Sequence, residues 1–205
     1  MARKKKTTST VEKEKATKSG MNVGYQGKLT VKINSGKTTI STKTYHNTGT
    51  YKMFKFLCDS LAGYDTAKSR PCQIRLFSAT GAEKAELPNT WEYNDELVSS
   101  PFIAVTSTNI SPKSVKDGSG KVITDAAEVT YTFKIPYAFL SKEIYKAALY
   151  STSVSSLKDD KFAYFGFITN DATPVWDPII LEDRSGNYSL IIEWTIIISN
   201  LYNAG

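Results

Sequence analysis

Side chains that could carry out chemistry are few in this sequence, and they do not gather into a known catalytic pattern. The one histidine, His46, lies in the segment Tyr45-His-Asn-Thr-Gly-Thr50, among residues typical of turns and helix caps. A histidine in such a setting is much more often a surface or cap residue than a catalytic base. The chain also has no phosphate-binding glycine loop, no nucleophile elbow and no His/Cys cluster with zinc spacing. We therefore predict that the protein is not an enzyme and has no catalytic residue, no metal and no cofactor.

Carboxylates gather at four places, and such clusters can hold calcium or supply the acid and base of glycoside cleavage. The clusters are Glu83/Glu86, Glu92/Asp95/Glu96, Asp159/Asp160 and Glu182/Asp183. Nothing beyond their spacing indicates a site, because acidic residues also gather in solvated loops. We interpret all four as loop charge.

Three aromatic residues lie in segments with the composition of loops, namely Trp91, Tyr93 and Trp176. An exposed aromatic ring has an apolar face and a polar edge, so it could stack on a sugar. Tryptophans in loops also close the ends of β-sandwiches, and we favour this interpretation. The three residues remain candidates for a glycan site or for a subunit interface.

The N-terminal segment, residues 1–22, has the composition of an extended basic arm. Residues 1–20 contain seven Lys/Arg and two Glu, a net charge of +5, which leaves only +1 of the total +6 for the rest of the chain. With a single valine, this stretch cannot bury enough apolar surface to fold alone. It is a flexible tail, a phosphate-binding arm or an arm that inserts into a neighbouring subunit. Its basic residues are Arg3, Lys4, Lys5, Lys6, Lys13, Lys15 and Lys18.

Residues 23–205 are expected to form one domain. The chain of 205 residues is 40% apolar, which is enough for one good core. No uncharged apolar run reaches the length of about 18 residues that a membrane span needs, and the N-terminus has no secretory signal. We therefore expect folding in a cytoplasm and no membrane partner. The two cysteines, Cys58 and Cys72, are expected to be buried free thiols, although a bridge would form if Cys58 packed on the strand that Cys72 opens.

The most apolar segment is residues 189–200, near the C-terminus. Its β-branched and aromatic content favours a strand over a helix. By parity, one face of this strand is wholly apolar and consists of Leu190, Ile192, Trp194, Ile196 and Ile198. We predict that this face lies in the core against a second sheet, because an exposed edge of this kind would pair with copies of itself.

Shorter segments predict further strands. Residues 29–33 and 39–44 flank an Asn-Ser-Gly turn, as in a hairpin. Strand character also occurs at residues 71–77, 102–108, 129–135, 162–168 and 179–181, whereas residues 144–150 could be a strand or a short helix. Roughly eight strands with Pro/Gly/Asn interruptions are typical of an antiparallel β-sandwich or jelly roll, mainly β with one short helix.

The expected helix follows residue 50. Thr48 and Thr50 could cap its start with their hydroxyls, and Gly63 lies where a left-handed residue would end it. One helical face contains Met53, Phe54, Leu57, Cys58 and Leu61. We predict that this face covers an end or an edge of the sheet. A DNA-recognition helix is not favoured, because the polar side carries only two lysines.

Several of these segments together resemble small virion proteins of tailed bacteriophages. The resemblance lies in residues 45–50, the helix up to Gly63, Arg70-Pro71, the strand at 74–77 and the closing strand at 190–200, about a third of the chain. It implies a β-sandwich building block of the virion, made in the host cytoplasm. Such a protein decorates a capsid, joins a head fibre or lies at the head–tail region, and docks through its N-terminal arm.

Three features of the residues agree with this expectation. A polar arm, a near-neutral β body and surplus apolar strand surface at 162–168, Ile191 and Ile197 suit a protein that forms homo-oligomers and binds other virion proteins, either capsid or connector. One alternative is a coat protein that contacts nucleic acid, through the arm only. A second alternative is a carbohydrate-binding β-sandwich module.

Overall fold

The structure is a computed structural model, and it describes residues 22–64, 66, 69–78, 98–99, 101–116, 120–136, 143–156, 160–167, 175–180 and 188–201. Within these residues the protein is mainly β with one helix, as predicted. The arm up to residue 21, together with Trp91 and Tyr93, lies outside the described residues. The elements are β1 (Asn22–Ser35), β2 (Thr38–Gly49), α1 (Tyr51–Leu61), β3 (Gln73–Ser78), β4 (Val98–Ser99), β5 (Ile103–Ala104), β6 (Ser107–Lys116), β7 (Val122–Pro136), β8 (Glu143–Ile144), β9 (Lys146–Tyr150), β10 (Lys161–Gly166), β11 (Ile179–Ile180) and β12 (Tyr188–Leu201).

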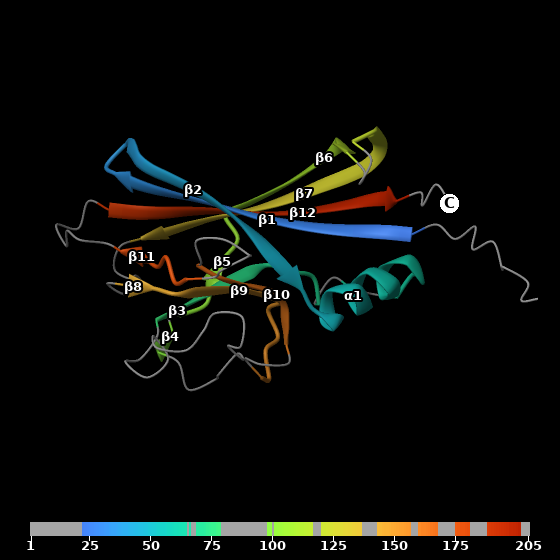
Figure 1. Cartoon of the computed structure of the whole chain (residues 1–205). Helices are drawn as coiled ribbons and strands as arrows, with labels where there is room; N and C mark the ends of the chain where they lie inside the picture. Colours follow the sequence, from blue (N-terminus) through green and yellow to red (C-terminus); the bar gives the residue numbers. More distant parts are fainter. Residues whose placement is uncertain are drawn as a thin grey trace, which may run out of the picture.

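Ten of the strands form one sheet, in the order β4-β3-β9-β10-β2-β1-β12-β7-β6, with β5 also paired to β3. Each described pair is antiparallel. Strands β2, β1, β12, β7 and β6 form an upper layer, and β10, β9, β3, β4 and β5 form a lower one (Figure 1). Strand β2 joins the layers, because it pairs with β1 along most of its length and with β10 at Thr48 and Gly49.

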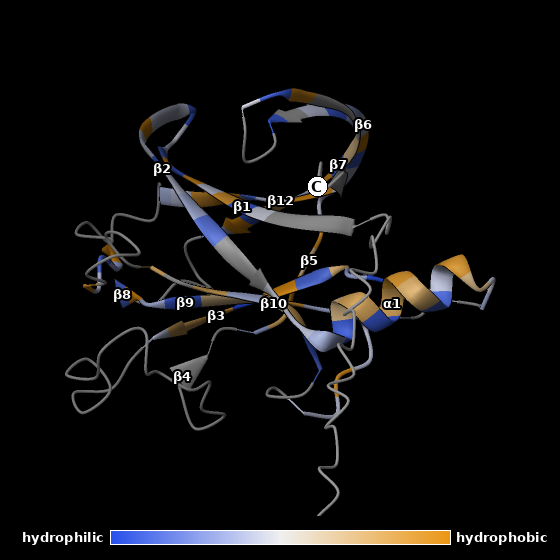
Figure 2. Ribbon diagram, turned by 45° about the vertical axis from the view of Figure 1, so that its right-hand side comes forward, coloured by the Kyte–Doolittle hydropathy of each residue, from blue (hydrophilic) through white to orange (hydrophobic). Residues whose placement is uncertain are grey.

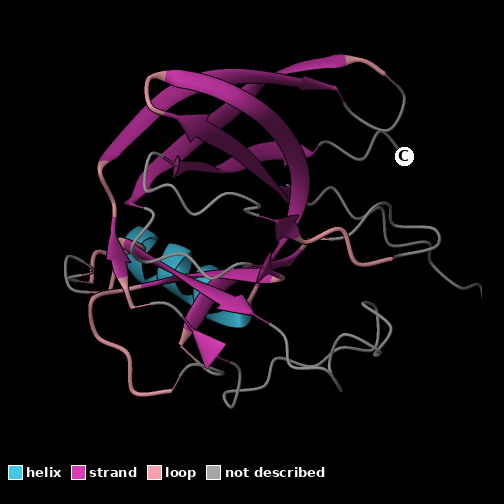
Figure 3. Ribbon diagram, turned by 90° about the vertical axis from the view of Figure 1, so that its left-hand side faces the viewer, coloured by secondary structure: helices cyan, strands magenta, loops and turns pink. Residues whose placement is uncertain are grey.

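On the side away from β2, the segment between β5 and β6 joins the two layers. The N–H of Val105 donates to the carbonyl of Cys72, beside β3, at 2.8 Å. The N–H of the next residue, Thr106, donates to the carbonyl of Thr132 on β7 at 2.7 Å. The sheet therefore curls nearly onto itself, and Figure 3 shows the strands arranged as a ring.

The predicted C-terminal strand is β12, at the centre of the upper layer. Trp194 lies between Leu29 of β1 and Tyr131 of β7 in the strand ladder. Its core partners include Leu149 and Phe162 of the lower layer, which are fully buried. Four of the five side chains predicted to form the buried face of β12 are buried, namely Leu190, Ile192, Trp194 and Ile196, and the fifth, Ile198, is half-buried.

The apolar segment that forms β10 is buried in the core of this chain. The ring of Tyr45 lies 4.9 Å from that of Phe165 and 5.1 Å from that of Phe167. On the outward face of β12, Ile197 is buried and Ile191 is half-buried. The surplus apolar strand surface that the sequence indicated for oligomerisation is therefore largely covered within the chain, because the curled sheet places both layers against one core.

The segment that the sequence left undecided between helix and strand is β9. It lies between β3 and β10 and is buried on both faces, so its residues show no alternation of polar and apolar types. Leu149 faces the main core, whereas Tyr150 packs with Phe77 on the opposite side. The ring of Phe102 meets that of Tyr150 edge-on at 5.5 Å. A small second core therefore covers the outside of the lower layer.

Candidate binding surface at the helix end

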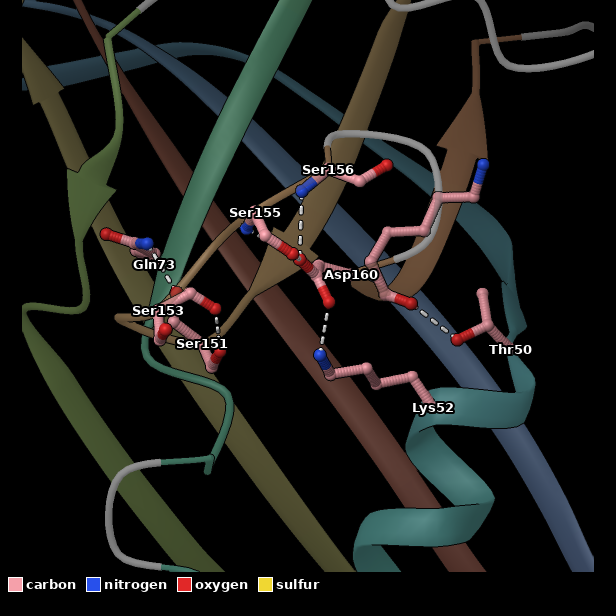
Figure 4. A network of polar contacts seen from close by, with 9 residues as sticks. Thr50, Lys52, Gln73, Ser151, Ser153, Ser155, Ser156 and Asp160 are labelled. Atoms are coloured by element: carbon pink, nitrogen blue, oxygen red, sulfur yellow. Dashed lines mark hydrogen bonds and ion pairs between the residues drawn. The ribbon is translucent and has the colours of Figure 1, made fainter.

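Helix α1 begins directly after β2 and is tied to the lower layer at its start. The N–H of Thr50 donates to the carbonyl of Phe162 at 2.9 Å. The Thr50 hydroxyl points to the carbonyls of Lys161 and Phe162, at 2.5 and 2.9 Å (Figure 4). Thr50 is the N-cap residue, as predicted, but its hydroxyl does not cap the helix. The reason is that β10 presents carbonyl acceptors directly beside it.

An ion pair between Lys52 and Asp160 provides a second attachment. Lys52 Nζ lies 2.5 Å from Asp160 Oδ1, and Asp160 Oδ2 accepts hydrogen bonds from the N–H groups of Ser155 and Ser156 at 2.7 and 2.9 Å (Figure 4). The hydrogen bond from Lys52 is the largest cause that holds the pKa of the Asp160 carboxyl well below its usual range; burial opposes it, and the serine bonds reinforce it. Asp160 therefore holds the loop before β10 onto α1.

Helix α1 has two apolar sides, and only one of them packs on the body. Met53 is 2% exposed, and the ring of Phe56 meets that of Phe162 edge-on at 5.6 Å. The other side lies in solvent, and its large residues there are Tyr51 (81% exposed), Phe54 (45%) and Leu61 (89%). We call this side, with the exposed Cys58, the outer face of α1. The spacing of its members by three and four residues places them in one row along the helix.

The sequence predicted that one apolar face of the helix would be covered, and this is correct only in part. Met53 is buried and Leu57 is half-buried, but Phe54, Cys58 and Leu61 are exposed. The helix projects past the strands of the lower layer, so no strand of that layer covers its far end (Figures 1 and 2). The predicted end is confirmed, because Gly63 has a positive φ of 78° just after the last turn.

An apolar cleft of about 420 Å³ lies between α1 and the upper layer. Arg70 is the only charged residue in its lining within the described part of the chain, and Cys72 lies two residues further on. The largest apolar walls are formed by Phe56 and Leu57 of α1, Val129 and Tyr131 of β7, and Ile196 and Ile198 of β12. The cleft therefore combines an almost wholly apolar surface with one cation.

The positive charge of Arg70 extends into this cleft. Burial raises the pKa of the Tyr131 phenol and of the Cys72 thiol, and in both cases the Arg70 guanidinium opposes the rise. Arg70 itself is exposed, so it lies at the solvent side of the cleft. No hydrogen bond or ion pair of Arg70 occurs within the part of the chain that the structure describes. The arrangement suits an apolar group that carries an anionic end.

Of the three aromatic candidates, only Trp176 is among the described residues. It is half-buried, and its ring meets that of Tyr145 edge-on at 5.6 Å. The neighbouring Asp177 pairs with Lys43 of β2 at 2.8 Å. These contacts fix the Trp176 segment against the body at the end opposite α1.

The remaining candidates for chemistry stay apart in the described structure. His46 is exposed on β2, and within the described ranges no three His, Cys, Asp or Glu side chains gather into a group that could hold a metal. Cys58 and Cys72 are free thiols, as predicted, but the prediction that both are buried is wrong, because Cys58 is exposed and Cys72 is half-buried. The carboxylates between residues 83 and 96, Asp159, and the pair at 182–183 lie outside the described residues.

The sequence did not reveal the cleft. Its lining comes from five separate stretches of the chain, and each apolar residue in it also fits the alternation of an ordinary core strand. The one available signal was Arg70, a charged residue three positions before the start of β3. That signal is weak, because charged residues commonly precede strands.

Comparisons with known proteins identify no relative. No protein-family model matches the chain, and no curated protein or solved structure shows significant similarity to it. Over the residues that the structure describes, α1 is too short to cross a lipid bilayer, and there is no other helix. The functional inference therefore depends on the contacts and surfaces described above.

Proposed function

We propose that this chain is a structural protein of a bacteriophage particle, which decorates the capsid, joins a head fibre or lies at the head–tail region. Its body is a β-sandwich of the jelly-roll kind, and its basic N-terminal arm docks it to other virion proteins. The observation that supports this best is the outer face of α1. A row of large apolar side chains lies in solvent there, and its members Leu61 and Tyr51 are the most exposed large apolar residues in the described part of the chain.

The exposed row has the properties of a contact surface. Tyr51 and Leu61 are each more than four-fifths exposed, and Tyr64, just past the helix, is 70% exposed. Exposed apolar surface of this size on a soluble domain marks interaction sites more often than it serves stability. An apolar helical row fits a groove on a partner, through residues spaced by three and four positions.

The outer face and the start of β1, which follows the arm in the chain, lie at the same end of the body. Strand β1 begins at Asn22, where the arm ends, and Tyr25 pairs with Ile198 of β12. Ile198 lines the same cleft as Leu57 of α1. The arm carries +5 of the total charge of +6. An electrostatic contact through the arm and an apolar contact through α1 can therefore act on one partner surface.

The test is incorporation of the chain into phage particles in infected cells, with variants supplied in place of the native chain. Removal of residues 1–20 should lower the amount of this chain per purified particle at least about tenfold, because a loss of about 1.4 kcal/mol in docking is a factor of ten. Mass spectrometry measures the chain, and absorbance measures the packaged nucleic acid. Unchanged incorporation with loss of nucleic acid would instead support the nucleic-acid-binding coat protein.

The contribution of α1 is tested by the double substitution Tyr51→Ser/Leu61→Ser. Incorporation should fall while the free chain unfolds at an unchanged temperature, because both side chains are exposed. The matched control is Ile40→Ser/Ile180→Ser, which removes two half-exposed residues that lie away from α1. Trp176→Ala addresses the carbohydrate-binding alternative: loss of retention on a glycan array with normal incorporation would favour it over the virion proposal.

A further inference from the structure

The cleft between α1 and the upper layer combines an apolar lining with one cation, and docking through the outer face does not require this combination. Its volume of about 420 Å³ falls within the range of small-molecule sites, which is about 300–1,000 Å³. Apolar side chains from both α1 and the upper layer form its walls. It opens beside an exposed arginine, so a ligand could enter with one end still in water.

We propose that this cleft binds a small amphipathic carboxylate, with an alkyl chain between α1 and β12 and with the carboxylate at Arg70. This goes beyond the proposed virion function and does not depend on it. The ligand class follows from the lining, in which apolar walls recognise an alkyl chain and the one cation recognises an anion. A guanidinium can bind both oxygens of a carboxylate through two parallel hydrogen bonds.

Arg70 is available for this contact. Ion pairs hold other cations of the body, such as Lys32 to Glu193 and Lys43 to Asp177, but none forms with Arg70 within the described residues. Its charge acts on two groups of the cleft wall, since it lowers the pKa of Tyr131 and of Cys72 against the effect of burial. A bound carboxylate near these groups would be stabilised by the same charge.

A hydroxyl group is also available. The Tyr131 hydroxyl forms no hydrogen bond within the part of the chain that is described, although its ring lines the cleft. A phenol can donate one hydrogen bond to a carboxylate oxygen. Arg70 and Tyr131 line the same cleft, and in the proposed complex both contact the anionic end of the ligand. This gives the site a polar end and an apolar body.

The two cysteines provide a direct test on the full-length protein. Cys72 lines the cleft, and Cys58 lies on the outer face of α1, outside the lining. The sequence contains no other cysteine. We expect decanoate to slow the alkylation of Cys72 by iodoacetamide several-fold, with no effect on Cys58. Mass spectrometry of the two peptides measures both rates in one sample.

Matched probes and variants separate the anionic contact from simple apolar binding. Decanol and decyltrimethylammonium carry the same alkyl chain with a neutral and a cationic end. Decanoate should protect Cys72 at a concentration about fivefold lower than decanol, as expected for one partly exposed charge-assisted contact. Arg70→Gln should remove that advantage, whereas Lys37→Gln, in the turn between β1 and β2, should keep it.

A filled cleft provides the last control. In Val129→Phe, the larger ring should occupy the cleft, so that Cys72 reacts slowly without any probe and decanoate has no further effect. Thermal unfolding of each variant shows whether it is folded. Equal protection by decanoate and decanol, an unchanged preference in Arg70→Gln, or no protection of Cys72 by decanoate would each refute the proposal.

Discussion

The centre of the sheet and the outer face of α1 are both rich in large apolar residues, yet they differ completely in exposure. Trp194 is fully buried between the two layers, whereas Leu61 is 89% exposed. The difference arises because β12 has strands on both sides and a second layer beneath it, whereas α1 packs on the body along one side only. Hydrophobicity alone therefore does not separate residues that hold a fold together from residues available for a partner.

The largest effect is expected from Trp194→Ala, at the centre of the sheet. The substitution should lower the free energy of unfolding by about 3–5 kcal/mol, because it leaves a cavity that rigid strands cannot close. Urea unfolding measures it. Trp194→Phe should cost clearly less, because it keeps most of the volume and removes an indole N–H that finds no acceptor within the described residues. If Trp194→Ala and Trp194→Phe lowered the free energy of unfolding equally, the surrounding side chains would be shown to fill the space left by the ring, and the site would not be a rigid core.

A smaller effect is expected where α1 joins the body. Asp160→Asn should lower the free energy of unfolding by about 1–3 kcal/mol, because it weakens the contact with Lys52 and the hydrogen bonds from Ser155 and Ser156. The control is Asp177→Asn, which removes a more exposed pair with Lys43 and should cost at most about 1 kcal/mol.

The lowered pKa of Asp160 also predicts how the free energy of unfolding changes with pH. In the folded chain the pKa of Asp160 lies well below that of an unfolded aspartate, about 3.9. Its stabilisation is therefore fully present above that value and is lost as the pH falls below it, when the unfolded state binds a proton more readily. Urea unfolding at pH 7 and pH 3 should show that native protein and Asp160→Asn differ less at the lower pH. A constant difference would mean that the pKa of Asp160 is not lowered in the folded chain.

The smallest effect on stability is expected on the outer face of α1. Leu61→Ser should change the free energy of unfolding by no more than about 0.5 kcal/mol, as usual for an exposed position. The same substitution should weaken docking to particles. Leu61 is therefore expected to matter for docking and hardly for stability, whereas Trp194 is expected to matter mainly for stability. A large loss of stability in the isolated chain would show that Leu61 has a partner within the chain, and would remove the distinction between the two regions.

The strands could be predicted from the sequence where apolar and polar residues alternate along them. Along β12 the residues Leu190, Ile192, Trp194 and Ile196 of one face are buried, and at the end of β7 the buried Phe133 and Ile135 alternate with exposed residues, so the pattern of residue types already contains the face that packs. Strand β9 was not predictable, because burial on both faces removes the alternation. Helix α1 was predicted as an element, but its covered side was not. A helical pattern with apolar residues on two sides does not indicate which side meets the body.

Residue types alone led to a mainly β chain, a polar arm, two free thiols and one helix that ends near Gly63, because these depend on local propensity and on the period of apolar residues. The tertiary structure alone decided that the segment at β10 is buried, that the outer face of α1 is exposed, and that Arg70 and Tyr131 meet at one cleft. These outcomes depend on how a curled sheet brings together stretches far apart in the chain. The local pattern of residue types contains no information about which distant stretches come into contact.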